Sequence, residues 1–115
     1  MATVKKVVVS DKADDADEEF TITVTLDDDS IEGKYGDMTF TKGVATLTLK
    51  GDESATATGL PTTVGYTVAE ETADGFVTTY TNEKGEISKT AATATVTNTR
   101  ETGDLTVKKI GRAHV

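Results

Sequence analysis

The stretch Phe20-Thr21-Ile22-Thr23-Val24-Thr25-Leu26 alternates apolar residues with threonine. Successive side chains of a β-strand point to opposite faces, so this spacing gives the strand one apolar face and one polar face. Threonine and valine also favour strands, because branching at Cβ restricts χ1 in a helix. The stretch therefore predicts a strand that covers a hydrophobic core on one side and meets solvent on the other.

The same period of two recurs along the chain, and turns rich in Gly, Asp and Asn separate the alternating segments. We expect strands over residues 2–8, 20–26, 38–40, 44–49, 54–60, 64–70, 76–80, 86–90 and 92–98, with a turn at 82–85. Helix should be a minor component. The fold class is therefore predicted to be all-β.

The composition narrows the function classes. A net charge of −8 argues against a nucleic-acid partner or an anionic membrane surface, since both require a basic face. The chain has no cysteine, so neither a disulfide nor a thiolate metal site can stabilise it. No apolar run is long enough to span a bilayer, and no signal peptide is recognisable. We expect a piece of a longer exported protein that needs another covalent staple.

A short repeat suggests how the chain is organised. Thr3-Val4-Lys5-Lys6 recurs as Thr106-Val107-Lys108-Lys109 after a polar linker. We expect one domain over residues 1–100, then a linker and the truncated first strand of a following copy over 101–109, and a non-native tail over 110–115. The expected partners are therefore neighbouring repeats, and the isolated strand could add weakly to the sheet edge of a second molecule.

Three polar residues fall on the apolar faces of predicted strands: Lys6 on the first, Glu70 in the middle and Asn98 on the last. Buried charges are costly unless they are paired or neutralised, so the three call for a joint explanation. Desolvation favours the neutral amine and the neutral acid, and a neutral amine is a nucleophile. The acid could polarise the Asn98 carbonyl and pass a proton to departing ammonia, leaving an amide between Lys6 and Asn98.

Two neighbours compete for these roles. Lys5 is the alternative nucleophile and Glu71 the alternative acid, but the alternation turns both away from the apolar face. Taken singly, each of the three inward residues could instead be an end-of-strand group that reaches solvent.

At this point the chain resembles a known family, the CnaB-like and pilin isopeptide-linkage domains of Gram-positive surface proteins. The resemblance spans residues 3–99 and is carried by the order and spacing of several short motifs. They are Thr-Val-Lys-Lys at 3–6, Glu-Phe-Thr-Ile-Thr-Val-Thr-Leu at 19–26, Tyr-Gly-Asp-Met-Thr-Phe at 35–40, Gly-Leu-Pro at 59–61, Tyr-Thr-Val-Ala-Glu at 66–70, Gly-Phe at 75–76 and Val-Thr-Asn-Thr at 96–99.

In that family a first-strand lysine bonds to a last-strand asparagine with the help of an acid that ends a Tyr-x-x-x-Glu strand. The resemblance thus implies a Lys6–Asn98 isopeptide bond with Glu70 as the catalytic acid. It also implies an immunoglobulin-like, CnaB-type antiparallel β-sandwich whose first and last strands are adjacent. The implied role is a stalk or pilin module of a cell wall-anchored, extracellular protein. Such a module is a monomer without a cofactor or metal, and its only chemistry is single-turnover self-crosslinking.

Other functions fit less well. The acidic stretches at residues 14–19 and 27–29 lack the central glycine of many calcium loops, so we expect them to be solvated. His114 lies in the expected non-native tail and is assigned no metal or catalytic role. The alternative function is a carbohydrate- or matrix-binding adhesin module of the same fold, with host matrix or other surface proteins as partners. Exposure of Tyr35 and Tyr80 on one surface would favour it.

Overall fold

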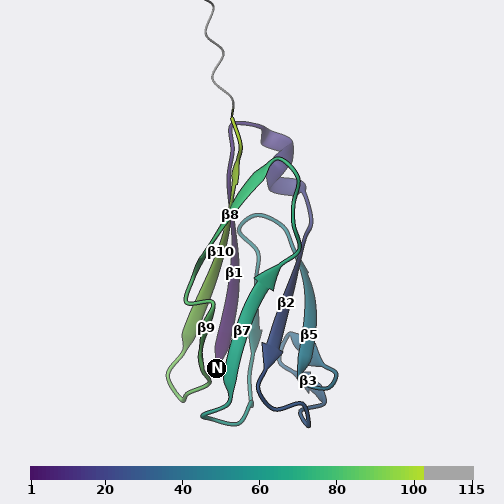
Figure 1. Ribbon diagram of the computed structural model, residues 1–115, viewed down its shortest axis with the longest axis vertical. Helices are drawn as coiled ribbons and strands as arrows, with labels where there is room; N and C mark the ends of the chain where they lie inside the picture. Colours follow the sequence, from purple (N-terminus) through teal and green to yellow (C-terminus); the bar gives the residue numbers. More distant parts are fainter. Residues whose placement is uncertain (103–115) are drawn as a thin grey trace, which may run out of the picture.

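The computed structural model describes residues 1–102 and consists almost entirely of strands and turns (Figure 1). Its elements, in chain order, are β1 (Ala2–Val9), the 3-10 helix η1 (Ala13–Asp17), β2 (Phe20–Leu26), β3 (Gly33–Tyr35), β4 (Met38–Phe40), β5 (Val44–Leu49), β6 (Ser54–Ala57), β7 (Gly65–Glu70), β8 (Phe76–Thr81), β9 (Lys84–Glu86) and β10 (Ala92–Arg100). No helix among these residues is long and apolar enough to cross a membrane.

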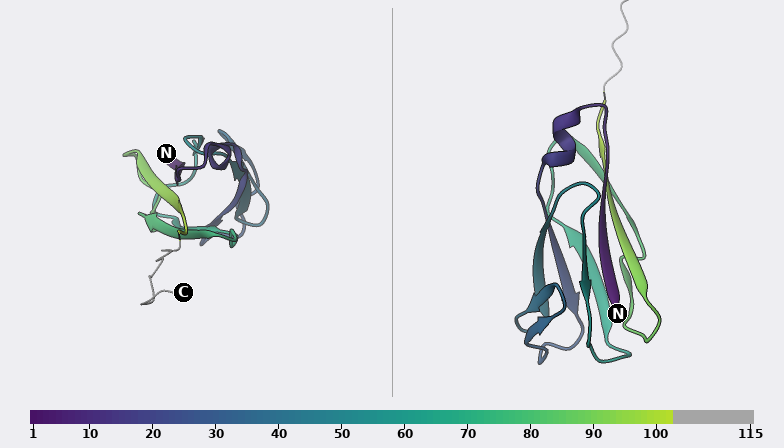
Figure 2. Two further views of the ribbon diagram at one scale, coloured as in Figure 1. Left: turned by 90° about the horizontal axis from the view of Figure 1, so that it is seen from above. Right: turned by 180° about the vertical axis from the view of Figure 1, so that it is seen from behind.

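Two four-stranded sheets pack face to face. One has the order β6-β1-β10-β8 and the other β5-β2-β7-β9, with β3 and β4 as a separate hairpin (Figures 1 and 2). The predicted immunoglobulin-like β-sandwich is confirmed, and so is the adjacency of the first and last strands. Within this fold β1 and β10 run parallel, in register from Ala2 opposite Ala92 to Val9 opposite Thr99. The other strand pairs of the described chain are antiparallel.

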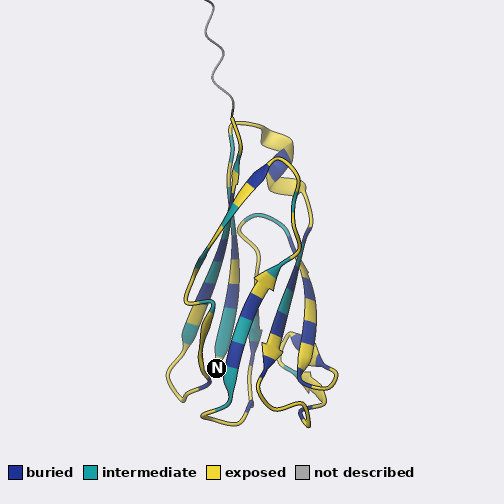
Figure 3. Cartoon of the chain, in the orientation of Figure 1, coloured by how far each residue is buried: buried dark blue, intermediate teal, exposed yellow. Residues whose placement is uncertain are grey.

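The alternation predicted from the sequence is visible as bands of buried and exposed residues along the strands (Figure 3). On β2 the residues Phe20, Ile22, Val24 and Leu26 are all buried, while their threonine neighbours face outward or are half-buried. The core lies between the two sheets, as the period of two requires.

One predicted strand is wrong in position. The structure has β9 at Lys84–Glu86, largely where we expected a turn, and no strand over residues 87–90. The chain does not turn back there: at Asn82, which adopts a left-handed φ of 57° that asparagine tolerates better than most residues, it crosses from the first sheet to the second and continues in the same direction. β9 then pairs with β7 and extends the second sheet. The strand expected over residues 54–60 ends at Ala57, shortly before Gly59 with its φ of 82°.

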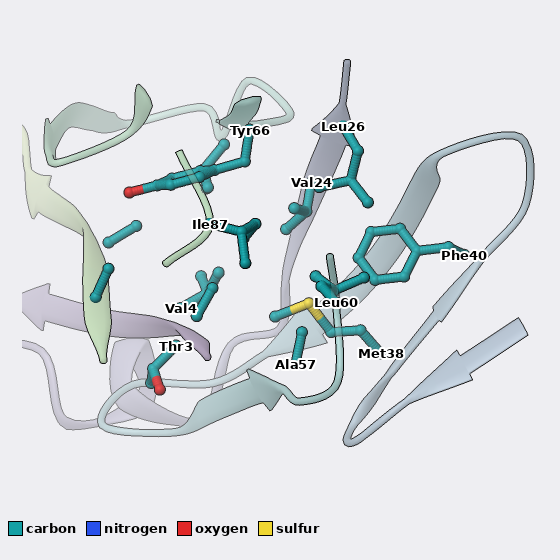
Figure 4. A pocket seen from close by; sticks show the side chains of 14 residues that line it. Thr3, Val4, Val24, Leu26, Met38, Phe40, Ala57, Leu60, Tyr66 and Ile87 are labelled. Atoms are coloured by element: carbon teal, nitrogen blue, oxygen red, sulfur yellow. The ribbon is translucent and has the colours of Figure 1, made fainter. Parts of the chain in front are cut away.

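The end of the sandwich near the N-terminus contains a small apolar cavity (Figure 4). Its lining includes Val4, Phe40, Leu60 and Tyr66, and its volume is about 10 Å³. A single water needs about that much space and several polar partners as well, so this cavity is a packing gap and not a ligand pocket.

Candidate crosslinking site

Lys6 and Asn98 meet on the inner face of the β1–β10 pair. In the parallel register Lys6 lies opposite Val96, and Asn98 lies opposite Val8. The two residues are therefore offset by two positions, or roughly 6.6 Å along the strands. The long lysine stem spans this offset, because Lys6 Nζ is in hydrogen-bond contact with Asn98 Oδ1 and lies 3.4 Å from the carbonyl oxygen of Val96.

Glu70 reaches the same point from the facing sheet. Its Oε1 lies 3.1 Å from Lys6 Nζ, and the side chains of Lys6 and Glu70 are 0% and 1% exposed. Asn98 is also fully buried. The structure thus brings together the three residues singled out in the sequence. The alternatives Lys5 and Glu71 are both exposed.

The surroundings of the amine are apolar and aromatic. Lys6 Nζ lies 4.3 Å from the centroid of the Phe20 ring. Burial lowers the pKa of Lys6 below its usual 10.5, and this effect outweighs the hydrogen bond and the charge of Glu70, which act in the opposite direction. A smaller proton affinity makes the neutral, nucleophilic amine more accessible than it is for a surface lysine.

One buried polar atom at this site has unused hydrogen-bonding capacity. No group among residues 1–102 accepts a hydrogen bond from Asn98 Nδ2, whereas Glu70 Oε1 has the ammonium of Lys6 as its close partner. An unpaired buried donor costs about 1–3 kcal/mol. Departure of the Asn98 nitrogen as ammonia would remove that cost.

Glu70 is held by two hydroxyl groups of β8, which the sequence analysis did not identify. The Glu70 backbone N–H donates to Tyr80 Oη at 2.9 Å, and Thr78 Oγ1 donates to Glu70 Oε2 at 3.3 Å. These contacts cross from one sheet to the other, so a strand pattern alone could not reveal them.

A second polar cluster lies next to this site, where β1 and β10 end. Arg100 binds Asp15 of η1 with two hydrogen bonds, Nε to Oδ2 at 2.9 Å and Nη2 to Oδ1 at 2.5 Å. Ser10 Oγ also donates to Asp15 Oδ2. We call Ser10, Asp15 and Arg100 the clasp. The hydrogen bonds from Arg100 and then Ser10 lower the pKa of Asp15 to about 2.

The clasp corrects one expectation. We predicted a solvated loop for the acidic stretch at 14–19, but Asp15 is buried, at 4% exposure, and paired with a residue 85 positions away. Arg100 also lies over the Phe76 ring at 4.2 Å, and Phe76 packs edge-on against Phe20 with ring centroids 5.4 Å apart. The aromatic pair therefore links the clasp to the apolar surroundings of Lys6.

Comparison with known protein families identifies the family of this chain. The family described as "Domain of unknown function (DUF7601)" matches residues 2–100. The chain belongs to this family. No curated protein matches this chain significantly.

Solved structures similar to this DUF7601 domain include a pilus-presented adhesin and two major pilins. The pilus-presented adhesin Spy0125 (Cpa) superimposes with a TM-score of 0.67 at 24% identity, over 88% of this chain and 27% of the adhesin. The Streptococcus pyogenes major pilin T-13 has a TM-score of 0.69 at 20% identity, and the T3.2 pilin of the same species 0.68 at 23%. Each of these matches covers 87% of this chain and 44% of the pilin. The pilin-like fold inferred from the sequence is thereby confirmed, and the chain spans less than half of each of these proteins.

The two tyrosines whose exposure would favour a sugar-binding surface make contacts within the DUF7601 domain instead. Tyr35 and Tyr80 are both partly buried against the core. Tyr35 packs on Phe40 with ring centroids 6.0 Å apart, and the hydroxyl of Tyr80 binds Glu70. No cluster of three metal-ligating side chains occurs within residues 1–102, the acidic stretches included. The proposed following strand at 105–109 and His114 lie outside the described residues.

Proposed function

We propose that this domain is a stalk or pilin module of an extracellular, cell wall-anchored Gram-positive protein. In this proposal it is stabilised by a self-formed amide bond between Lys6 and Asn98. The observation that carries the proposal is the contact of a fully buried Lys6 Nζ with both Asn98 Oδ1 and Glu70 Oε1. The likeness to domains of a pilus-presented adhesin and of two major pilins supports the surface role.

The chemistry begins with proton transfer from Lys6 to Glu70 across their 3.1 Å contact. This leaves a neutral amine and a neutral acid, the forms that an apolar site favours. The amine nitrogen attacks the side-chain carbonyl carbon of Asn98, while the acid of Glu70 donates to the carbonyl oxygen and stabilises the tetrahedral intermediate.

Collapse of the intermediate breaks the bond between that carbon and Nδ2. The nitrogen leaves as ammonia, after receiving through Glu70 the proton that the attacking amine gives up. The products are one secondary amide, one ammonia and Glu70 in its protonated form, which returns to the starting carboxylate when it gives its proton to the departing ammonia. Because the three groups are held in contact, the reaction is intramolecular and requires no separate enzyme. The domain turns over once, on itself.

Intact-mass measurement of the purified protein tests this function. Wild type should weigh one ammonia less than its sequence mass, whereas Lys6→Ala, Asn98→Ala and Glu70→Ala should each retain the full mass. Lys5→Ala and Glu71→Ala are the matched controls, and both should still lose ammonia. A wild-type mass equal to the sequence mass in mature, folded protein would refute the proposal.

A further inference from the structure

The position of Glu70 depends on the strand that faces it. β9 pairs with β7 only over Gly65, Tyr66 and Thr67, so the ladder on that side ends before Glu70. The unpaired backbone N–H of Glu70 instead donates to Tyr80 Oη of β8 at 2.9 Å. The main chain of Glu70 is therefore fixed by the sheet that carries Lys6 and Asn98, and not only by its own.

The carboxyl group of Glu70 has two unlike oxygens. Oε1 faces Lys6 Nζ at 3.1 Å, whereas Oε2 accepts a hydrogen bond from Thr78 Oγ1 at 3.3 Å. Thr78 lies directly opposite Asn98 in the β8–β10 ladder. The strand pair that presents the reacting amide therefore also sets the rotation of the catalytic carboxyl.

We propose that Thr78 is a positioning residue for amide formation. Its hydroxyl donates to Oε2 of Glu70, so that Oε1 is the oxygen that takes and carries the proton. This inference rests on the proposed self-crosslinking function. Before proton transfer Oε2 is a carboxylate oxygen, and after Oε1 takes the proton from Lys6 it is the carbonyl oxygen of the acid. It accepts the Thr78 hydrogen bond in both states. The contact therefore persists through the proton transfer and keeps Oε1 directed at Lys6 and Asn98.

The rate of bond formation tests this role. Cell-free synthesis of the full chain is stopped with a translation inhibitor, and aliquots are denatured over time for intact-mass analysis. Thr78→Val removes the hydroxyl at nearly constant volume and should slow the loss of ammonia roughly tenfold or more, as expected for a lost hydrogen bond to a charged group. Thr78→Ser restores a hydroxyl and should recover most of the rate. Thr79→Val, on the exposed face of the same strand, should react like wild type.

A purely structural role is separated by a second measurement. Thr78→Val is combined with Lys6→Ala, so that neither the reference nor the variant can crosslink, and their melting temperatures are compared. The positioning role predicts little difference between them. A Thr78→Val rate within twofold of wild type would overturn the inference, as would a Thr78→Ser protein as slow as Thr78→Val. A slow Thr78→Val protein whose melting temperature also falls clearly in the Lys6→Ala background would overturn it too. Absence of ammonia loss in wild type itself would overturn the proposed function and this inference together.

Discussion

Two polar contacts join the beginning of the chain to its end, and they are built in opposite ways. At the Lys6–Asn98 contact all groups are buried, and Asn98 Nδ2 has no acceptor among the described residues. In the clasp Arg100 and Asp15 satisfy one another with two hydrogen bonds, and the Arg100 side chain remains 26% exposed. The first arrangement leaves unused bonding capacity in an apolar site and is suited to reaction. The second is complete and is suited to holding two strand ends together.

The two contacts also respond differently to protonation. The pKa of Lys6 is lowered because burial disfavours its charge, so charged Lys6 opposes folding. The pKa of Asp15 is lowered because hydrogen bonds favour its charge, so charged Asp15 supports folding. A lowered pKa therefore reflects a destabilising charge at Lys6 and a stabilising charge at Asp15.

The largest effect should follow from preventing the proposed Lys6–Asn98 bond. Lys6 and Asn98 are 92 residues apart, and a covalent closure of that length is worth about 4–5 kcal/mol by the loop-entropy argument used for disulfides. Asn98→Ala should therefore lower the melting temperature by about 20 °C or more in scanning calorimetry. A melting temperature within a few degrees of wild type would show that the contact contributes little beyond packing.

Breaking the clasp should have a smaller effect and leave the crosslink intact. Arg100→Met keeps an apolar stem near Phe76 but removes both hydrogen bonds to Asp15. We expect a modest fall in melting temperature together with the full loss of ammonia. Arg100→Lys, which keeps the charge without the planar fork, should recover only part of the difference. An uncrosslinked Arg100→Met protein would show instead that the clasp is needed to bring Lys6 and Asn98 into register.

Lowering the pH should remove the stabilising effect of the clasp over a defined pH range. Asp15 has a folded pKa of about 2 against a usual value of 3.8, so its stabilising contribution is complete above about pH 4. It should be lost as the pH falls through about 2. The difference in stability between the wild type and Asp15→Asn, followed by denaturant unfolding, should shrink over that range. Asp14→Asn, which removes an exposed carboxylate of η1 outside the clasp, is the matched control.

The smallest effect should appear at alkaline pH in a protein that cannot crosslink. In Asn98→Ala the unfolded chain binds a proton at Lys6 more tightly than the folded chain does, so stability should rise with pH as the pH approaches the unfolded value of 10.5. The double variant Lys6→Met/Asn98→Ala lacks that group and should lack this rise. Parallel pH profiles of the two proteins would mean that Lys6 is not desolvated in the fold.

Much of the contact between Lys6 and Asn98 could be predicted from the sequence, because it depends on the period of two. Lys6 and Asn98 share the faces of Val4 and Val96, and a strand pattern assigns faces reliably. The all-β class follows from the same signal. The position of β9 could not be predicted, because Asn82 and Lys84-Gly85 look like turn residues whether the chain reverses there or, as in the structure, passes from one sheet to the other.

The clasp and the hydroxyls around Glu70 could not be predicted in this way. Asp15 lies among several acidic residues that look alike in the sequence, and only the packing of η1 against the end of β10 selects it. Thr78 and Tyr80 contact Glu70 across the gap between two sheets, and their spacing along β8 contains no information about what lies opposite. Contacts between layers depend on how the sheets stack, which short-range patterns do not encode.

The parallel pairing of β1 and β10 affects how far the domain can lengthen when its two ends are pulled apart. Because both strands run the same way, the chain enters at one end of the sandwich and leaves at the other (Figure 1). With the Lys6–Asn98 amide in place, the segment between these residues, which are 92 positions apart, becomes a side loop that lies off the line of tension. Fully extended, that segment would add roughly 300 Å of contour length. A row of such modules would therefore keep its span when pulled, with only the short arms outside each ring free to stretch.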